Sequence, residues 1–260
     1  MKYAFMTFST PEMELAPVLA LARELGYDGI EVRVSAGHKH GLEPDATPEQ
    51  RTAACDAVRA TGVPICCVAT SCRFADPAIR EGLVQQALQC IDLAADVGAG
   101  CIRVFGGQLP EGTAREAAVE QVAEALGRLA GRARERGVAV CMETHDDWCD
   151  PHHVAAVMQK VDDPAIAVNW DIMHPVRRGG ATMDEAFEIL KPWIRHVHFH
   201  DGKPGEGLCL IGQGDIDHRR AVELLQGLGY DGYLSGEWIN RGPHEDYLAA
   251  ELATMRGYEA

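Results

Sequence analysis

A repeated pattern of helix, glycine and short apolar run limits the fold of this sequence more than any other feature. It occurs five times, at residues 22–34, 58–70, 94–106, 133–145 and 225–238. A glycine just past the end of a helix takes the left-handed conformation that closes the last turn. A short apolar run that begins a few residues later is typical of a strand buried on both faces of a parallel sheet. The pattern therefore predicts repeated helix–strand units.

The segments between these copies complete a set of eight strands and eight helices. Strands are expected at about residues 2–8, 29–34, 63–69, 100–105, 138–143, 165–170, 194–200 and 233–237. Helices are expected at about residues 11–25, 47–61, 77–97, 113–136, 151–161, 182–191, 217–227 and 244–256. Eight such units in roughly 250 residues are typical of a (β/α)8 barrel. An open doubly wound sheet would more often carry a glycine-rich dinucleotide loop after its first strand, and residues 8–13 (FSTPEM) are not one.

No linker or low-complexity segment divides the chain, so we expect an α/β protein with a single TIM-barrel domain over residues 1–260. Its 39 acidic and 24 basic residues give a formal net charge of −15. This charge disfavours duplex nucleic acid and anionic membranes as partners, because both need a basic face. The N-terminal residues have too short an apolar stretch for a signal peptide, and the nine cysteines include no CxxC pair. We therefore expect a cytoplasmic protein, with reduced thiols, that acts on a small molecule.

Residues 194–217 (IRHVHFHDGKPGEGLCLIGQGDID) hold a dense set of polar side chains. In a strand, the alternate positions of His196, His198 and His200 place three imidazoles on one face. Asp201 and several glycines follow, which predicts a loop. A strand that ends in potential metal ligands and opens into such a loop is typical of one wall of an active site. A histidine-rich edge strand without a function is the alternative.

In a barrel of this kind, catalytic side chains lie at the C-terminal ends of the strands. The last four predicted strands each deliver one acid or imidazole there, namely Glu143, Asp171, His198 and Glu237. Alternation along each strand turns all four inward. For any single one of them, an ordinary ion pair is an equally good interpretation. Three crowded carboxylates, however, repel each other or take up protons unless a cation neutralises them. The set suits one divalent ion, with Mn²⁺, Mg²⁺, Co²⁺ and Zn²⁺ all open, and its lack of thiolates argues against a structural zinc site.

Several short motifs occur in an order and spacing that are more specific than any one of them. They are residues 25–33 (LGYDGIEVR), 142–145 (METH), 169–174 (NWDIMH), 196–201 (HVHFHD), 212–217 (GQGDID) and 229–237 (GYDGYLSGE). Together they resemble the xylose isomerase-like TIM-barrel superfamily, in particular its sugar phosphate isomerase/epimerase family. That group includes ketose 3-epimerases, inosose dehydratases and hydroxypyruvate isomerases. The resemblance is specific for the superfamily and not for one reaction.

The resemblance implies roles for individual residues. The metal ligands would be Glu143, Asp171, His198 and Glu237. Glu143 and Glu237 would also form the acid/base pair, on opposite faces of the substrate. His145 and His174 look like histidines that bind the substrate or support the ligands. His200, a further candidate for substrate binding, departs from the family pattern, in which lysine often stands at this position.

This constellation supports proton transfer next to a carbonyl. A divalent ion with four protein ligands has room for two substrate oxygens and stabilises the enediolate that forms when the neighbouring proton leaves. One carboxylate removes that proton and a second returns one. Return to the other face of the same carbon is epimerisation, return to the next carbon is isomerisation, and expulsion of a β-hydroxyl is dehydration. We expect an isomerase or epimerase of a ketose or related carbonyl polyol. The alternative is a dehydratase or lyase of an inosose, a keto sugar or a dehydroshikimate-like acid.

Four further residues are candidates for substrate contact, each with a plainer alternative. Arg103 points inward from the fourth strand, where it could instead belong to a buried ion-pair network. Trp148 could pack on a sugar face or within a lid. Lys203 and Glu206 lie after the seventh strand, in a segment that is either a lid or a simple surface loop. A phosphate could dock at the helix that starts after Asp217, but no cluster of lysine or arginine supports it, so we favour an unphosphorylated substrate.

Two other classes of protein share the same barrel. Abasic-site endonucleases of the superfamily resemble this chain at the rim, but they use a three-zinc cluster with added histidines from the third and fourth strands. Those strands end here in residues 67–72 (CVATSC) and 103–107 (RVFGG), which contain none. A non-catalytic sugar-binding barrel is also open, although the presence of both glutamates argues against it. Relatives often form dimers or tetramers, so a homo-oligomer is compatible with the sequence.

Overall fold

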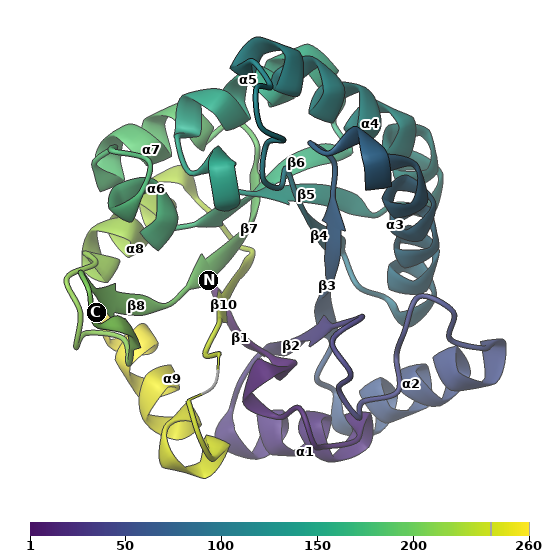
Figure 1. The fold of residues 1–260 in the computed structure, drawn as a ribbon. Coiled ribbons are helices and arrows are strands. Elements are labelled where there is room, and N and C mark those ends of the chain that lie inside the picture. Colours follow the sequence, from purple (N-terminus) through teal and green to yellow (C-terminus); the bar gives the residue numbers. More distant parts are fainter. Residues whose placement is uncertain (240, 260) are drawn as a thin grey trace.

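The computed structural model describes residues 1–239 and 241–259 and shows eight parallel strands inside a ring of helices (Figure 1). The strands follow one another around the barrel in the order β1-β10-β7-β6-β5-β4-β3-β2. The barrel closes because β1 pairs in parallel with both β2 and β10. This arrangement confirms the expected (β/α)8 barrel.

The strands of the barrel lie close to their predicted positions. They are β1 (Lys2–Met6), β2 (Gly29–Arg33), β3 (Ile65–Arg73), β4 (Cys101–Phe105), β5 (Ala139–Glu143), β6 (Ile166–Asp171), β7 (Ile194–Phe199) and β10 (Tyr233–Gly236). The α-helices are α1 (Leu15–Leu25), α2 (Pro48–Thr61), α3 (Pro77–Val97), α4 (Arg115–Arg136), α5 (Pro151–Val161), α6 (Met173–Arg177), α7 (Met183–Leu190), α8 (His218–Leu228) and α9 (Leu248–Gly257). Short 3₁₀ helices are η1 (Thr7–Ser9), η2 (Asp146–Trp148) and η3 (His244–Asp246).

The ends of the helices follow from local sequence signals. Helix α1 ends at Gly26 with φ 86°, and α4 ends at Gly137 with φ 67°, in the left-handed region that glycine enters without steric cost. Helix α8 begins after Asp217, whose side chain accepts a hydrogen bond from the backbone N–H of Arg220 at 3.0 Å. This contact caps the helix that the sequence predicts to start after Asp217. These signals fix where each helix stops and the next strand starts.

Alternation along the strands divides their side chains between two environments. Outward-facing residues such as Val168, Trp170 and Val197 are fully buried in the large apolar core. Inward-facing residues include a cluster of small side chains inside the barrel, formed by Ala4, Cys66, Cys67, Cys101, Cys141 and Ala167. Beyond this cluster, toward the C-terminal ends of the strands, Arg103 in β4 and Asn169 in β6 are buried polar groups, and Glu31 in β2 is a third. The barrel therefore has an apolar floor beneath a polar mouth.

Two segments differ from the prediction. Part of the segment expected to be a glycine loop forms an antiparallel hairpin of β8 (Asp201–Lys203) and β9 (Gly207–Cys209), which extends outward from β7 (Figure 1). Its turn contains Gly205, with φ 79°, which allows so tight a connection. The short helix α6 was not predicted. It begins directly after Asp171, whose Oδ1 accepts hydrogen bonds from the backbone N–H groups of Met173 and His174 at 2.9 and 3.1 Å.

Candidate active site at the mouth of the barrel

Four acidic or imidazole side chains meet at the C-terminal mouth of the barrel. They are Glu143 at the end of β5, Asp171 at the end of β6, His198 in β7 and Glu237 just after β10. Each offers one ligand atom, and these atoms all lie within 4.8 Å of one another. His198 Nδ1 is 3.3 Å from Glu143 Oε1 and 3.5 Å from Glu237 Oε2. We call these four residues the rim quartet; all are buried, and Glu237, at 6% exposure, is the most accessible.

An arginine from the neighbouring strand balances part of this negative charge. Arg103 Nε lies 3.0 Å from Glu143 Oε2, and its Nη1 donates to the carbonyl of Thr70 at 2.7 Å. Burial alone would raise the pKa of Glu143, but the charges of Arg103 and His198 lower it to about 2. Arg103 is only 1% exposed. Its surroundings favour the buried ion-pair alternative, and a contact between Arg103 and a substrate stays a prediction.

The donor atoms of the rim quartet fit a divalent cation. Asp171 Oδ2 is buried, and His200 Nε2 lies 2.6 Å from it. Three buried carboxylates this close together repel each other unless cations neutralise them. Three carboxylates and one imidazole suit the harder and borderline divalent ions. The residues present therefore fit the expected metal ion; their role as ligands stays a prediction.

Three histidines stand side by side next to Asp171. The ring centroids of His145 and His174 are 4.6 Å apart, and those of His174 and His200 are 5.4 Å apart. His174 Nδ1 and His200 Nδ1 are buried and make no hydrogen bond within the described part of the chain, while His200 Nε2 lies 2.6 Å from Asp171 Oδ2. Burial alone would lower the pKa of His145, but its hydrogen bond with Asp146 and the charge of Glu143 raise it to about 9. The predicted substrate histidines thus form a polar row beside the rim quartet.

The remaining predicted contacts lie elsewhere. Trp148 is fully buried, its Nε1 donates to the carbonyl of Gly107 at 2.8 Å, and a Cβ added at Gly106 would come within 2.3 Å of its ring. A side chain with no exposed surface favours the packing alternative for Trp148, and a contact with substrate stays a prediction. Lys203 and Glu206 are exposed on the hairpin, with Nζ and Oε2 3.9 Å apart. Their exposure favours the surface alternative, and a contact with substrate stays a prediction.

Asp201 was noted in the sequence only as the residue before a loop, but it organises that loop. Its Oδ1 accepts from the backbone N–H groups of Gly202 at 2.8 Å and Ile216 at 3.4 Å. Its Oδ2 accepts from Gly212 and Gly214, both at 2.9 Å. A Cβ at Gly214 would lie 2.0 Å from Asp201 Oδ1, so only glycine fits. An aspartate followed by closely spaced glycines was the available signal.

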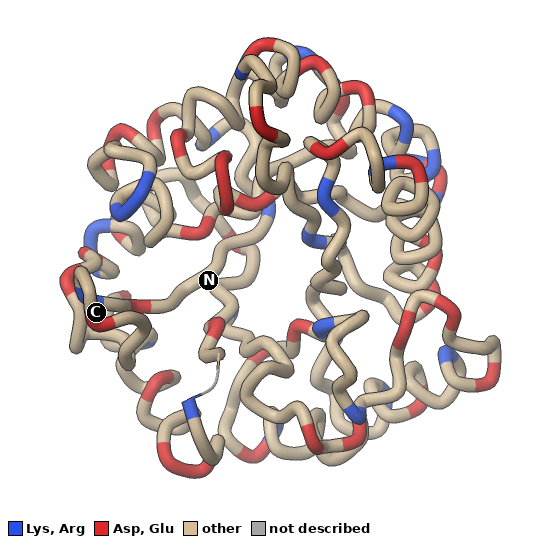
Figure 2. The backbone as a smooth tube through the Cα atoms, in the orientation of Figure 1, with Lys and Arg blue, Asp and Glu red and all other residues tan. Residues whose placement is uncertain are grey.

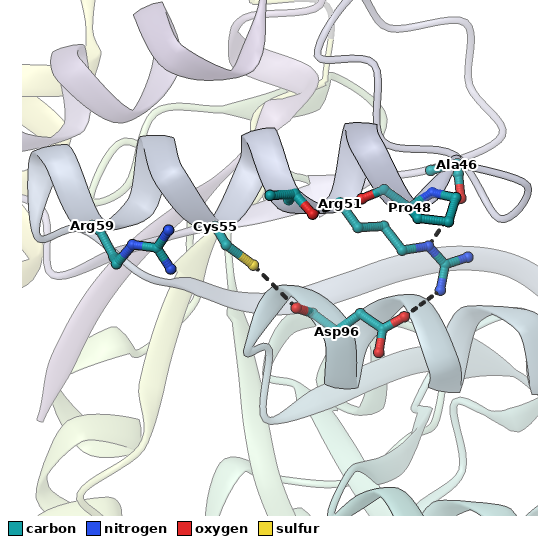
Figure 3. Close-up of a pocket in the computed structure, with 7 residues that line it drawn as sticks. Ala46, Pro48, Arg51, Cys55, Arg59 and Asp96 are labelled. Atoms are coloured by element: carbon teal, nitrogen blue, oxygen red, sulfur yellow. Dashed lines mark hydrogen bonds and ion pairs between the residues drawn. The ribbon is translucent and has the colours of Figure 1, made fainter.

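Two cavities can be compared as candidate substrate sites, one at the mouth of the barrel and one outside it. A cavity of about 440 Å³ opens beside the rim quartet and is lined by Ser71, Arg73, Asp76, Phe105, Gln108, His145 and Asp146. A cavity of about 550 Å³ lies outside the barrel between α2 and α3 (Figure 3). There Arg51 binds Asp96 Oδ2 at 2.7 Å, and Cys55 Sγ donates to the carbonyl of Asp96 at 3.1 Å. The first cavity is the candidate for a substrate, because its lining includes His145, which follows Glu143 by two residues and packs on His174.

Charged residues of both signs lie on the helices that surround the barrel. Lys and Arg are interspersed with Asp and Glu around the ring of helices (Figure 2). Among the helices that the structure describes, none is both long and apolar enough to cross a membrane.

A closed barrel with polar groups converging at its C-terminal mouth defines the class of barrel enzymes whose chemistry takes place there. The chain belongs to the xylose isomerase-like TIM barrel family, whose model matches residues 19–258. This confirms the resemblance seen in the sequence.

Individual relatives extend this result. The chain is 28% identical over 254 residues to L-ribulose-5-phosphate 3-epimerase UlaE of Salmonella heidelberg (strain SL476), covering 92% of this chain and 87% of the relative. The probable 3-DHS dehydratase AsbF from Bacillus anthracis superposes with a TM-score of 0.82 at 19% identity, over 98% of this chain and 99% of that one. The IOLI protein with a bound zinc atom superposes with a TM-score of 0.79 at 16% identity, over 100% of this chain and 96% of that one. The 3-epimerase relative supports an enzyme of the isomerase/epimerase class, and the two solved structures support the fold.

Proposed function

We propose that this chain is a divalent-metal-dependent epimerase or isomerase that transfers a proton next to the carbonyl of a ketose or a related polyol. The rim quartet carries this proposal, because three buried carboxylates and one imidazole bring their ligand atoms within 4.8 Å of one another. Glu143, Asp171, His198 and Glu237 would hold the ion. When bound, a divalent ion would act as a Lewis acid and stabilise the negative charge that develops on the substrate oxygens.

Glu143 and Glu237 are the proposed acid/base pair. They reach the mouth from β5 and from the end of β10, and β6 and β7 lie between these strands. Two carboxylates that approach from separate strands can serve one carbon from two directions. One accepts the proton from the carbon, and the other, in its protonated form, donates one to the opposite face.

The row of histidines beside Asp171 would orient the substrate. His174 Nδ1 and His200 Nδ1 are buried and make no hydrogen bond to a described residue. Substrate hydroxyl groups can satisfy such nitrogens, since a hydroxyl both donates and accepts. The adjacent cavity of about 440 Å³ offers further polar contacts to a polyol chain.

We further propose that the substrate carries no phosphate. The 3-epimerase relative is named for a sugar phosphate. In this chain, however, the backbone N–H groups of Gly212 and Gly214, just before the start of α8, already donate to Asp201. Amide groups that are occupied by a carboxylate of the same chain are not free to bind a phosphate at this helix.

Solvent-exchange experiments test the reaction directly. Metal-loaded protein is incubated in D₂O with candidate ketoses, and products are followed by NMR and mass spectrometry. We expect deuterium at the carbon next to the carbonyl, with the carbon skeleton and oxygen count intact. Glu237→Gln should abolish exchange, whereas Glu188→Gln, at an exposed position on α7, should not change it. Loss of water from the substrate would assign the dehydratase alternative, and unchanged turnover by Glu237→Gln would refute the acid/base pair.

A further inference from the structure

A buried carboxylate contacts the rim quartet from across the barrel. Glu31 in β2 is fully buried, and β1 and β10 lie between its strand and β7. Its Oε2 is 2.8 Å from His196 Nε2. His198 Nε2 lies 3.1 Å from Glu31 Oε1 and 3.2 Å from Oε2. Glu31 therefore joins two imidazoles that are 165 and 167 positions away in the chain.

This contact determines which nitrogen of His198 is free. An ionised carboxylate only accepts hydrogen bonds, so the ring nitrogen that faces it must carry the hydrogen. A neutral imidazole has one N–H, and its other nitrogen then keeps a lone pair. For His198 the second nitrogen is Nδ1, which lies 3.3 Å from Glu143 Oε1 and 3.5 Å from Glu237 Oε2. Without an ion, Nδ1 can donate to these carboxylates in the same way; an ion held among them would take the place of that hydrogen. Binding a cation requires such a lone pair.

We propose that Glu31 is a positioning residue that fixes the tautomer and ring orientation of His198, so that Nδ1 presents its lone pair to the ion of the rim quartet. This inference rests on the metal centre proposed above. A histidine that binds a metal usually donates its other N–H to a carboxylate or carbonyl, and loss of that partner weakens metal binding. Glu31 touches neither the ion nor the substrate in this arrangement.

A second ion held by Glu31, His196 and His198 is the competing interpretation, because their ligand atoms also lie within 4.8 Å of one another. The geometry argues against it. Both imidazoles already make hydrogen bonds to Glu31, and these bonds use the oxygens that an ion would need. The rim quartet differs, since it brings three carboxylates to one imidazole, whereas Glu31 is a single carboxylate shared by two imidazoles.

Replacement of Glu31 by glutamine makes a sharp test. The amide of glutamine places one oxygen and one NH₂ where Glu31 has two acceptors. His198 Nε2 contacts both of these positions, at 3.1 and 3.2 Å, so it meets the NH₂ in either orientation of the amide. The NH₂ favours a lone pair on His198 Nε2, which moves the hydrogen to Nδ1 and weakens the ligand. We expect Glu31→Gln to weaken binding of Mn²⁺ or Zn²⁺, measured by isothermal titration calorimetry, by about 10- to 100-fold.

His196→Gln is the matched control. It changes the other partner of Glu31 inside the same buried cluster and leaves the contact between Glu31 and His198 intact. Metal affinity should then stay within about threefold of the wild type, because the orientation of the ligand is kept. Glu31→Asp keeps a carboxylate on a shorter side chain, so its metal affinity should lie between those of the wild type and Glu31→Gln.

A measurement on the unchanged protein covers the case in which Glu31→Gln does not fold. Protein with ¹⁵N-labelled histidine is loaded with Zn²⁺, and the ring signals of His198 are assigned from their loss in His198→Gln. We expect a hydrogen on Nε2 and none on Nδ1. A hydrogen on Nδ1, or metal bound through Nε2, would overturn the proposal.

The remaining outcomes separate this inference from the proposed function. Wild-type affinity in Glu31→Gln, or equal weakening in Glu31→Gln and His196→Gln, would overturn the positioning role and leave the metal centre standing. Failure of the wild type to bind any divalent ion would overturn the metal centre and this inference with it.

Discussion

Asp201 provides the strongest prediction about stability, because a single carboxylate holds a whole loop. It accepts three short hydrogen bonds from backbone N–H groups, at 2.8, 2.9 and 2.9 Å, and it is fully buried. A hydrogen bond to a charged group contributes about 1.5–3 kcal/mol, and a buried donor left without a partner loses a similar amount. Taken at the low end, the three bonds predict that Asp201→Ala lowers the free energy of unfolding by roughly 4–5 kcal/mol.

Differential scanning calorimetry measures this effect. For a chain of this size, each kcal/mol corresponds to about 2–4 °C, so the Tm of Asp201→Ala should fall by roughly 8–20 °C. The Tm of Asp201→Asn should fall by at least half as much as that of Asp201→Ala. An amide has an acceptor on one side only, whereas N–H donors face both oxygens of Asp201.

The control for this prediction lies in the same loop. Asp215 is 54% exposed and pairs with Arg177 at the surface. Exposed ion pairs contribute at most about 1 kcal/mol, so Asp215→Asn should shift the Tm by no more than about 4 °C. A Tm for Asp201→Ala that matches that of Asp215→Asn would refute the role of Asp201 in holding the loop.

Two further predictions concern metal removal and pH. Chelation should abolish turnover and lower the Tm in a thermal-shift assay, because an ion at 100 times its Kd stabilises the folded state by about 2.7 kcal/mol; an unchanged Tm would contradict an ion bound at the rim. Burial raises the pKa of Glu251, which accepts from Trp238 Nε1 at 2.6 Å and the N–H of Ile211 at 3.0 Å. A raised folded-state pKa means that the contribution of Glu251 is complete below the ordinary value of 4.5 and is lost as the pH rises through the folded value. In Glu251→Gln, the Tm should therefore decline less steeply above pH 4.5 than in the wild type. Identical profiles of Tm against pH for the two proteins would contradict the raised pKa of Glu251.

The fold was predictable because its signals are local. The glycine that ends α1 and the short apolar run that forms β2 lie within one stretch of sequence, and the pattern recurs along the chain. Alternation is also local, so it placed Glu143, Asp171 and His198 on the inner side of their strands before closure of the barrel brought them together. The hairpin of β8 and β9 was missed because strands of three residues are too short to show a period.

Other features of the site depend on contacts that a local pattern does not contain. Glu31 meets His196 and His198 only through the closure of the barrel, across more than 160 positions. Trp148 follows β5 at a position that suits either a sugar or a packed interior. Trp148 is buried because Gly106, just after β4, leaves room for its ring, and because the carbonyl of Gly107 accepts its N–H. The sequence contains all of these residues but not their pairing.

Strand β7 shows why the fold and the site depend on one register. Its outward-facing Val197 and Phe199 are fully buried in the core, while its inward-facing His196 and His198 bind Glu31. The side-chain period of a strand is two, so a slip of one residue would exchange these two sets. The slip would bury imidazoles among helices and turn apolar side chains toward the rim quartet. The packing energy that aligns Val197 and Phe199 with the helices therefore also aims His198 Nδ1 at Glu143 and Glu237.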